Sequence, residues 1–522
     1  MGEGLIRLLK EKIKAEHKTA FVLTFFIAIL IHLYKFTNTL PNHDSVYNYY
    51  SDQNVLGSGR WALSFACSFS SYYDLPWVIG LLSCIFIALT VVVIVTLFKV
   101  KNPVLIGLIG ALLAASPATT ETFAFLYTAD GYMIAMLLAA LSVYFSRMDE
   151  TRYSRMLLSG VCICVSCGIY QAYVSFALVL AVCYFIDILI QNAHSKKECL
   201  KWILRQIIIY IVALAAYYII WKLCMLFIGI SANDYQGISD VGKINLSVIA
   251  NAFHESLRGI ALYLLQWNVL EQGFSVYSVI NIAFVIVAII CFVVSVIKSK
   301  IYKRRWAFAL TVLCLLAIVP FAFIWHFTSP TVVYAPRMLQ SLTLVFILIA
   351  LLYEKWTKPI TKNIVCLFLI ILAFNNAIMA NIFYFYMNQT YERTYAEGLE
   401  MMIEIHEFQD KYELKNIAFI GDRSGEVAYN SIDPGTGRMQ KEGQIQILIG
   451  NLEQSLLYDY ERAPKYLENT FGLDLEPVVG IQLTELENTE EVKALECWPA
   501  ENSMTVIGDI LVIKFSDIDK TE

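Results

Sequence analysis

Two apolar runs, TAFVLTFFIAILIHLYKF (residues 19–36) and WVIGLLSCIFIALTVVVIVTLF (residues 77–98), enclose the polar stretch NHDSVYNYYSDQNVLGSGR (residues 42–60). Each apolar run has close to the roughly 20 residues that a helix needs to cross a bilayer. The polar stretch between them is therefore predicted to lie at a membrane surface. It holds two aspartates, a histidine, an arginine and several tyrosines, which is more polar chemistry than a short connection between two helices needs.

The composition of the whole chain agrees with this pattern. Of the 522 residues, 58% are hydrophobic and 16% are charged. These values exclude a soluble globular enzyme and a disordered chain, and they are typical of a membrane protein with several spans and a soluble part. Met1–Lys18 is basic and amphipathic, and the apolar run after it lacks a small-residue cleavage site. We therefore expect the first apolar run to remain as a helix.

Eleven segments are predicted to span the membrane, so the expected fold class is an α-helical polytopic membrane protein. The third and fifth segments are shorter than the others. The segments lie at residues 19–36, 77–98, 103–117, 124–145, 156–171, 173–191, 206–229, 275–297, 306–326, 339–354 and 363–386.

The distribution of Lys and Arg predicts the orientation. With the N-terminus in the cytoplasm, the cytoplasmic segments hold 22 Lys and Arg, and the outer segments before residue 387 hold five. Cytoplasmic loops of membrane proteins are enriched in these residues. The N-terminus is therefore predicted to be cytoplasmic, and residues 42–60 are predicted to face outward.

A sharp change of composition at Met387 predicts a boundary between a transmembrane domain (residues 1–386) and a second domain, called the tail below (residues 387–522). The tail holds 11 Lys and Arg against 27 Asp and Glu. We expect a small extracytoplasmic α/β domain. Its predicted elements are a helix over Tyr391–Tyr412, a strand over Asn416–Ile420 and a hairpin of Met504–Ile507 with Ile510–Phe515.

Polar and ionisable side chains recur at the predicted outer ends of the spans. Such groups are costly at membrane depth, so each is a candidate for a functional site. Because several separate outer ends contribute, a shared cavity that opens outward is favoured. The candidates are His43, Asp44, Arg60, Glu121, Tyr127, Asp130, Tyr170, Gln171, Lys222, Arg258, His326 and Arg337.

Some of these candidates have a purely structural alternative. Asp44 precedes Ser-Val-Tyr and could cap a new helix, and Glu121 could cap the fourth span. Arg258 lies in the amphipathic stretch Leu246–Leu265, which is predicted to lie along the membrane surface and whose polar side could simply be solvated. The alternative for Arg337 is an anchor for lipid headgroups.

The chemistry of the candidates predicts glycosyl transfer from a polyprenyl-phosphate sugar. Cations at the membrane boundary suit a phosphate whose apolar tail stays in lipid, and aromatic rings suit the faces of sugars. A carboxylate beside an acceptor hydroxyl can act as a general base, the role that we predict for Asp44. Arg337 is predicted to bind the donor phosphate with help from Lys222 and Arg258, and the other candidates are predicted to line the substrate site.

No metal site and no cofactor are predicted, although a divalent cation is left open. Cys162, Cys164 and Cys167 have a suggestive spacing, but they lie inside an apolar run with no His or carboxylate nearby. Packing between helices is the favoured role for such small buried residues. The expected partners are the lipid-linked sugar donor, an acceptor glycan and membrane lipids, and no nucleic acid.

Several short motifs, in their order and spacing, resemble the Gtr type-II family of bacterial membrane glucosyltransferases, within the broad GT-C class. The motifs are Asn42-His43-Asp44, Gly59-Arg60-Trp61, Pro117 with Glu121, Tyr127 and Asp130, Gly168-Ile-Tyr170-Gln171-Ala-Tyr173, Ala335-Pro336-Arg337, and Trp498-Pro499-Ala500-Glu-Asn-Ser503 leading into Ile510–Lys514. Family members often have two adjacent acids where this chain has His43 and Asp44.

The resemblance implies a GT-C-like transmembrane catalytic domain in the bacterial inner (cytoplasmic) membrane. It further implies transfer of a sugar, often glucose, to a cell-surface glycan on the outer face. GT-C enzymes place an essential acid in the first outer loop, which here corresponds to Asp44. Two alternatives share the polar cavity: an O-antigen-type polymerase or ligase, and a flippase or transporter of lipid-linked glycans. A transporter would predict inverted repeats and broken helices in mid-membrane, which the sequence does not display.

Overall fold

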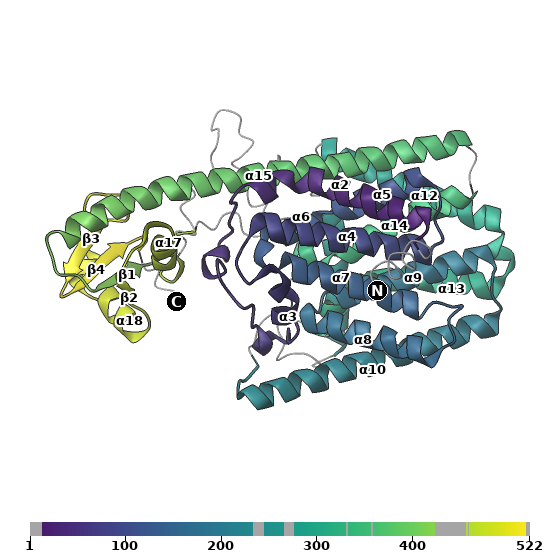
Figure 1. The fold of residues 1–522 in the computed structure, drawn as a ribbon, viewed down its shortest axis with the longest axis horizontal. Coiled ribbons are helices and arrows are strands. Elements are labelled where there is room, and N and C mark those ends of the chain that lie inside the picture. The colour runs from purple at the N-terminus through teal and green to yellow at the C-terminus, as the bar shows by residue number, and fades with distance from the viewer. Residues whose placement is uncertain are drawn as a thin grey trace, which may run out of the picture.

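The computed structural model describes residues 13–232, 245–265, 276–329, 332, 334–356, 359–422, 456–457 and 459–517. This part of the chain is mostly helical, with a small sheet near its C-terminal end. Figure 1 shows a bundle whose helices run roughly along the long axis of the molecule. One long helix, α15 (Pro359–Gln409), leads from the bundle to the sheet.

Among the described residues, eight helices are long and apolar enough to cross a membrane, or nine if one bent pair counts as a single span. Two further apolar helices are shorter. Each of the eleven predicted ranges overlaps one of these helices, but three of the helices are short or bent, so the count of eleven spans stays a prediction. The bundle helices are α2 (Ala15–Thr37), α4 (Pro76–Leu97), α5 (Pro103–Ala114), α6 (Pro117–Ala124), α7 (Ala129–Phe145), α8 (Tyr153–Ile169), α9 (Tyr173–Gln191), α10 (Lys196–Ile228), α12 (Val276–Ser299), α13 (Arg305–Ala322) and α14 (Gln340–Trp356).

The burial of these helices separates the centre of the bundle from its periphery. In the most apolar window of α9, 94% of the residues are buried, whereas only 17% are buried in that of α10. Large apolar side chains point outward from α10, including Leu226 and Phe227. An outer surface of this kind suits lipid, because the exposed apolar groups gain nothing from water.

The connection predicted between the third and fourth spans is instead a buried helix. All eight residues of α6 are buried, and α6 is bent by 44° relative to α5. Pro117 begins α6, as expected for a residue that lacks a backbone N–H and has a preset φ. The hydroxyls of α6 bond within the bundle: Thr122 Oγ1 donates to the carbonyl of Ala118 at 2.7 Å, and Thr119 Oγ1 donates to that of Leu113 at 2.9 Å. From hydropathy alone, this polar segment is predicted to be a connection outside the membrane.

The tail contains a four-stranded sheet with the strand order β2-β1-β4-β3. The predicted hairpin and strand are confirmed: β3 (Met504–Ile507) pairs antiparallel with β4 (Ile510–Lys514), and β1 (Asn416–Ile420) pairs parallel with β4. The two-residue turn places Gly508 at φ +67°, a conformation that glycine adopts without a steric cost. The remaining tail elements are β2 (Glu476–Pro477), α17 (Arg462–Phe471), α18 (Ile481–Glu487) and α19 (Glu490–Lys493).

Helix α15 runs without a break through the predicted boundary at Met387. Met387 is buried in the apolar core of the bundle, whereas Met401, Met402 and Ile405 are buried in the core of the tail. One helix therefore belongs to both parts. The division of the chain into two domains at this residue stays a prediction, because an unbroken helix marks no boundary.

The first connection, between α2 and α4, lies at the end of the bundle from which α15 leads to the sheet (Figure 1). Val46 of this connection is 1% exposed and belongs to the apolar core of the tail. The first connection and the tail must therefore lie on the same side of the membrane. That this side is the outer one rests on the Lys and Arg distribution.

This arrangement predicts the labelling pattern of introduced cysteines. In whole cells of a Cys497→Ser strain, we expect a membrane-impermeant maleimide to label Asp52→Cys but not Lys99→Cys, because Lys99 follows the other end of α4. A reporter enzyme that is active only outside the cytoplasm should be active when it is fused to the C-terminus. Labelling at both positions from one side would contradict the fold, and labelling of position 99 alone would reverse the orientation.

Candidate functional site

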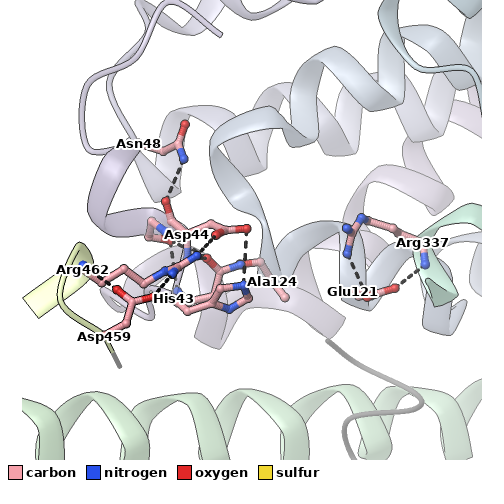
Figure 2. A network of polar contacts seen from close by, with 10 residues as sticks. His43, Asp44, Asn48, Glu121, Ala124, Arg337, Asp459 and Arg462 are labelled. Carbon is pink, nitrogen blue, oxygen red and sulfur yellow. Dashed lines mark hydrogen bonds and ion pairs between the residues drawn. The ribbon is translucent and has the colours of Figure 1, made fainter. Parts of the chain in front are cut away.

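A short turn presents Asp44 at the end of the bundle that faces the tail (Figure 2). Asn42 stabilises this turn, because its Oδ1 accepts hydrogen bonds from the backbone N–H groups of Asp44 and Ser45, each at 3.0 Å. The side chain of Asp44 makes no capping hydrogen bond. The alternative in which Asp44 is a helix cap is therefore wrong, and its carboxylate is left for other contacts.

The carboxylate of Asp44 lies between two nitrogen groups. Its Oδ2 is 3.4 Å from Nε2 of His43, and its Oδ1 is 3.3 Å from Nη2 of Arg462, the first residue of α17 (Figure 2). The side chain of Asp44 is nevertheless 37% exposed. An ionised carboxylate offers about four lone-pair sites, so these contacts leave it able to accept a further hydrogen bond.

His43 is nearly buried beside Asp44, and its ring lies edge-on to Phe125. Burial lowers the pKa of His43 to about 4; the cations of Arg462 and Arg337 act in the same direction, and Asp44 opposes them. The imidazole is therefore neutral near pH 7. A neutral imidazole donates through one nitrogen and accepts through the other. Its Nδ1 has no hydrogen-bond partner among the described residues.

Glu121 and Arg337 form a buried ion pair. The Glu121 carboxylate, which is 0% exposed, accepts hydrogen bonds from the backbone N–H of Arg337 and from its Nη1 at 3.0 Å (Figure 2). The guanidinium carbon also lies 4.1 Å from the centroid of the Phe125 ring. Glu121 therefore positions Arg337 and does not cap the fourth span, whose helix α7 begins only at Ala129.

The Asp44 group and the Glu121–Arg337 pair belong to one region of the structure. Figure 2 shows both groups in one close view. The charge of Arg337 acts on His43, and Tyr127 lies within electrostatic range of both Asp44 and Arg337. The structure thus brings together five of the residues predicted from the sequence: His43, Asp44, Glu121, Tyr127 and Arg337.

Arg60, Tyr170 and Gln171 form a second group. Nη1 of Arg60 donates to the hydroxyl of Tyr132 at 3.3 Å, and its guanidinium lies 5.0 Å from the ring centroid of Tyr170. The rings of Tyr132 and Tyr170 are stacked, with centroids 4.2 Å apart. Nε2 of Gln171 donates to the carbonyl of Ser58 at 2.7 Å, which ties the loop before Arg60 to the start of α9. Both rings are buried, so they hold the guanidinium of Arg60 rather than offer an open face to a ligand.

Arg60 also lines a cavity of about 740 Å³ between the first connection and the end of α10. This volume lies within the usual range of small-molecule sites. The lining residues are Asn54, Val55, Gly57, Ser58, Arg60, Gly229, Ile230 and Ser231.

The two predicted helpers of Arg337 contact residues of their own helices. Nζ of Lys222 lies 5.0 Å from the ring centroid of Trp221, on α10, and α10 follows the edge of the bundle opposite α2 and α15 (Figure 1). Arg258 lies on α11 (Leu246–Leu265), is 64% exposed and pairs with Glu255 at 3.6 Å.

Asp130 and His326 make contacts of their own. Asp130 is buried in the first turn of α7, where its Oδ1 accepts from the backbone N–H of Gly131 at 2.9 Å. His326 is stacked on Phe323 and lies 4.5 Å from the ring of Tyr334, between centroids, and burial lowers its pKa. Asp130 also interacts with Ser70 and Cys67 from the first connection, and His326 lies within electrostatic range of Glu255 on α11.

Within the part of the chain that the structure describes, no group of three or more His, Cys, Asp and Glu side chains could hold a metal ion. The absence of a metal site therefore stays a prediction from the sequence. The Asp44 group itself contains His43 and two carboxylates, those of Asp44 and Asp459. The guanidinium of Arg462 lies between the two carboxylates.

Sequence reasoning missed Arg462 and Asp459 in the tail. One local signal was readable: Asp459 Oδ1 accepts from the backbone N–H groups of Glu461 and Arg462, at 3.1 and 2.8 Å, as an aspartate often does before a helix. That signal predicts the start of α17. It says nothing of a contact with Asp44, which is 418 positions away in the chain.

A comparison with protein families matches residues 33–348 to the family described as glucosyl transferase GtrII. The matched segment is more than half of the chain and includes every candidate residue predicted from the sequence, from His43 to Arg337. Arg462 and the C-terminal motifs lie outside it. Comparisons with curated proteins and with solved structures gave no match. The chain therefore belongs to the GtrII family of glucosyltransferases, as its motifs predicted.

Proposed function

We propose that this membrane glucosyltransferase moves glucose from a polyprenyl-phosphate donor to a cell-surface glycan on the outer face of the bacterial cell membrane. One observation carries the proposal. An exposed carboxylate, Asp44, lies at the end of an apolar helix bundle, in the same region as the arginine Arg337. A donor with an apolar tail and a phosphate at the membrane boundary fits such a place.

In the proposed reaction, Asp44 removes the proton from an acceptor hydroxyl. The hydroxyl oxygen then forms a bond to C1 of the sugar, and the bond between C1 and the phosphate oxygen breaks. The phosphate leaves with the electron pair of that bond. Asp44 suits the role of base because its carboxylate is accessible and oriented by its neighbours.

Arg337 is proposed to bind the donor phosphate. Negative charge grows on the leaving phosphate, so a fixed cation there stabilises the transition state more than the ground state. Pairing with Glu121 is compatible with this role, because a guanidinium has five N–H donors in a planar fork and can contact more than one acceptor group. The buried carboxylate holds the guanidinium in one place, and the arginine side chain remains 18% exposed.

Arg60 is proposed to bind a sugar in the cavity that it lines. The buried, stacked rings of Tyr170 and Tyr132 hold its guanidinium there. No particular contact among the described residues favours the alternative functions, a polymerase or ligase and a flippase. An assay that follows one labelled glucose separates these functions, because a flippase changes no covalent bond and a polymerase or ligase transfers a preassembled chain.

We expect Asp44→Asn to lower kcat by about 10²–10⁴-fold, the usual effect of losing a general base. Asparagine keeps the size of the side chain but cannot take the proton. The measurement uses purified protein, a synthetic polyprenyl-phosphate glucose and an acceptor glycan. Asp52→Asn is the matched control, since Asp52 lies in the same connection and its Oδ1 accepts only a local bond from the backbone of Asn54 in the described contacts. If Asp44→Asn turned over at the parental rate, Asp44 would not be the general base.

Arg337→Lys tests the phosphate site. Lysine keeps the charge but cannot form two parallel hydrogen bonds to a phosphate. Losing one charge-assisted hydrogen bond of about 1.5–3 kcal/mol lowers turnover by roughly 10–100-fold. Arg393→Lys, on α15 near the membrane boundary, is the control for a general effect of losing an arginine. Full turnover in Arg337→Lys, with unchanged thermal stability, would support the lipid-anchor alternative instead.

A further inference from the structure

The tail contributes a side chain to the Asp44 group, and nothing in the family match, which ends at residue 348, assigns it a role. We propose that Arg462 is a positioning residue for Asp44, so that the tail completes the catalytic site of the transmembrane part. This inference rests on the proposed role of Asp44 as the base. It concerns a different part of the chain, and it can fail while that role stands.

Arg462 is itself held in place before it reaches Asp44. Its Nη1 pairs with Oδ2 of Asp459, three residues earlier in the chain, while its Nη2 lies 3.3 Å from Oδ1 of Asp44 (Figure 2). Asp459 is also bound to the backbone at the start of α17. The side chains of Arg462 and Asp459 are only 21% and 15% exposed. A pair with this little exposure is better fixed than an ordinary surface ion pair, which contributes little.

The turn that carries Asp44 is docked on α17 at a second point. Nδ2 of Asn469, two turns after Arg462, donates to the carbonyl of Val46 at 3.0 Å. The side chain of Val46 is buried in the apolar core of the tail. The guanidinium carbon of Arg462 also lies 5.8 Å from the centroid of the Tyr47 ring. The two ends of α17 therefore hold consecutive residues of one short turn.

These contacts orient the carboxylate of Asp44. Arg462 engages Oδ1 while His43 faces Oδ2, so the plane of the carboxylate is set from two sides. A base must lie within hydrogen-bond reach of the proton that it removes, and small errors of position are costly to the rate. The tail is thus expected to act on the rate of the chemical step, through Asp44, rather than on donor binding.

The first experiment compares kcat and KM of Arg462→Gln, Arg462→Lys and the parent with a synthetic polyprenyl-phosphate glucose. We expect Arg462→Gln to lower kcat by roughly 10–100-fold, the effect of losing one charge-assisted hydrogen bond, with KM for the donor little changed. Arg462→Lys keeps the cation and should recover part of the rate. Lys465→Gln is the matched control: Lys465 lies one turn along α17 and pairs with Glu468 at 2.9 Å. It should turn over like the parent.

A double-mutant cycle separates positioning from simple docking. If Arg462 acts through Asp44, then Arg462→Gln should cause no further loss in the Asp44→Asn protein, because the group that it positions has gone. An equal fold-loss in both backgrounds would overturn the proposal. It would also be overturned if Asn469→Ala, which removes the second docking contact without touching Asp44, lowered kcat as much as Arg462→Gln does.

The same variants distinguish failure of this inference from failure of the proposed function. If the Asp44→Asn protein were fully active, Asp44 would not be the base and Arg462 would have no base to position. An inactive Asp44→Asn protein with a fully active Arg462→Gln protein would leave the base in place and overturn only the role of Arg462. Thermal unfolding of each purified variant, compared with that of Lys465→Gln, verifies that the tail is folded.

Discussion

The ion pair between Glu121 and Arg337 is the interaction on which the site end of the bundle depends. A carboxylate with no exposed surface is costly unless a cation and hydrogen bonds compensate it, and Arg337 supplies both a guanidinium and a backbone N–H. This pair joins α6, a helix early in the chain, to the short turn before α14. The same arginine also acts on His43, although burial, Asp44 and Arg462 have larger effects there.

A second constraint acts from the tail. The turn at Asp44 has almost no regular structure of its own, being a single 3₁₀ turn capped by Asn42. Its position is therefore decided by what packs on it. Val46 is buried in the tail, and Arg462 and Asn469 contact Asp44 and Val46 of the turn. The position of Asp44 is therefore decided by two parts of the chain at once, which the unbroken helix α15 connects.

Much of the fold could be predicted from local pattern. The apolar runs predicted helices because a run of about 20 apolar residues has few other stable structures, and each predicted range overlaps a helix. The hairpin of β3 and β4 follows from two short apolar runs on either side of Gly508 and Asp509. The helix α6 could not be predicted in this way. Its Thr-Thr-Glu-Thr sequence is polar, and it is buried only because neighbouring helices and Arg337 satisfy its polar groups.

The sequence by itself determined the class of protein, the family and the list of polar residues that could matter, because composition, motif order and the cost of polar groups in lipid are local properties of the chain. Only the tertiary structure decided which of those residues meet. It joined Glu121 to Arg337, showed that Asn42 rather than Asp44 accepts the hydrogen bonds of the turn, and brought Arg462 to Asp44. Such contacts depend on how helices far apart in the chain pack together, and no local pattern in the sequence records that packing.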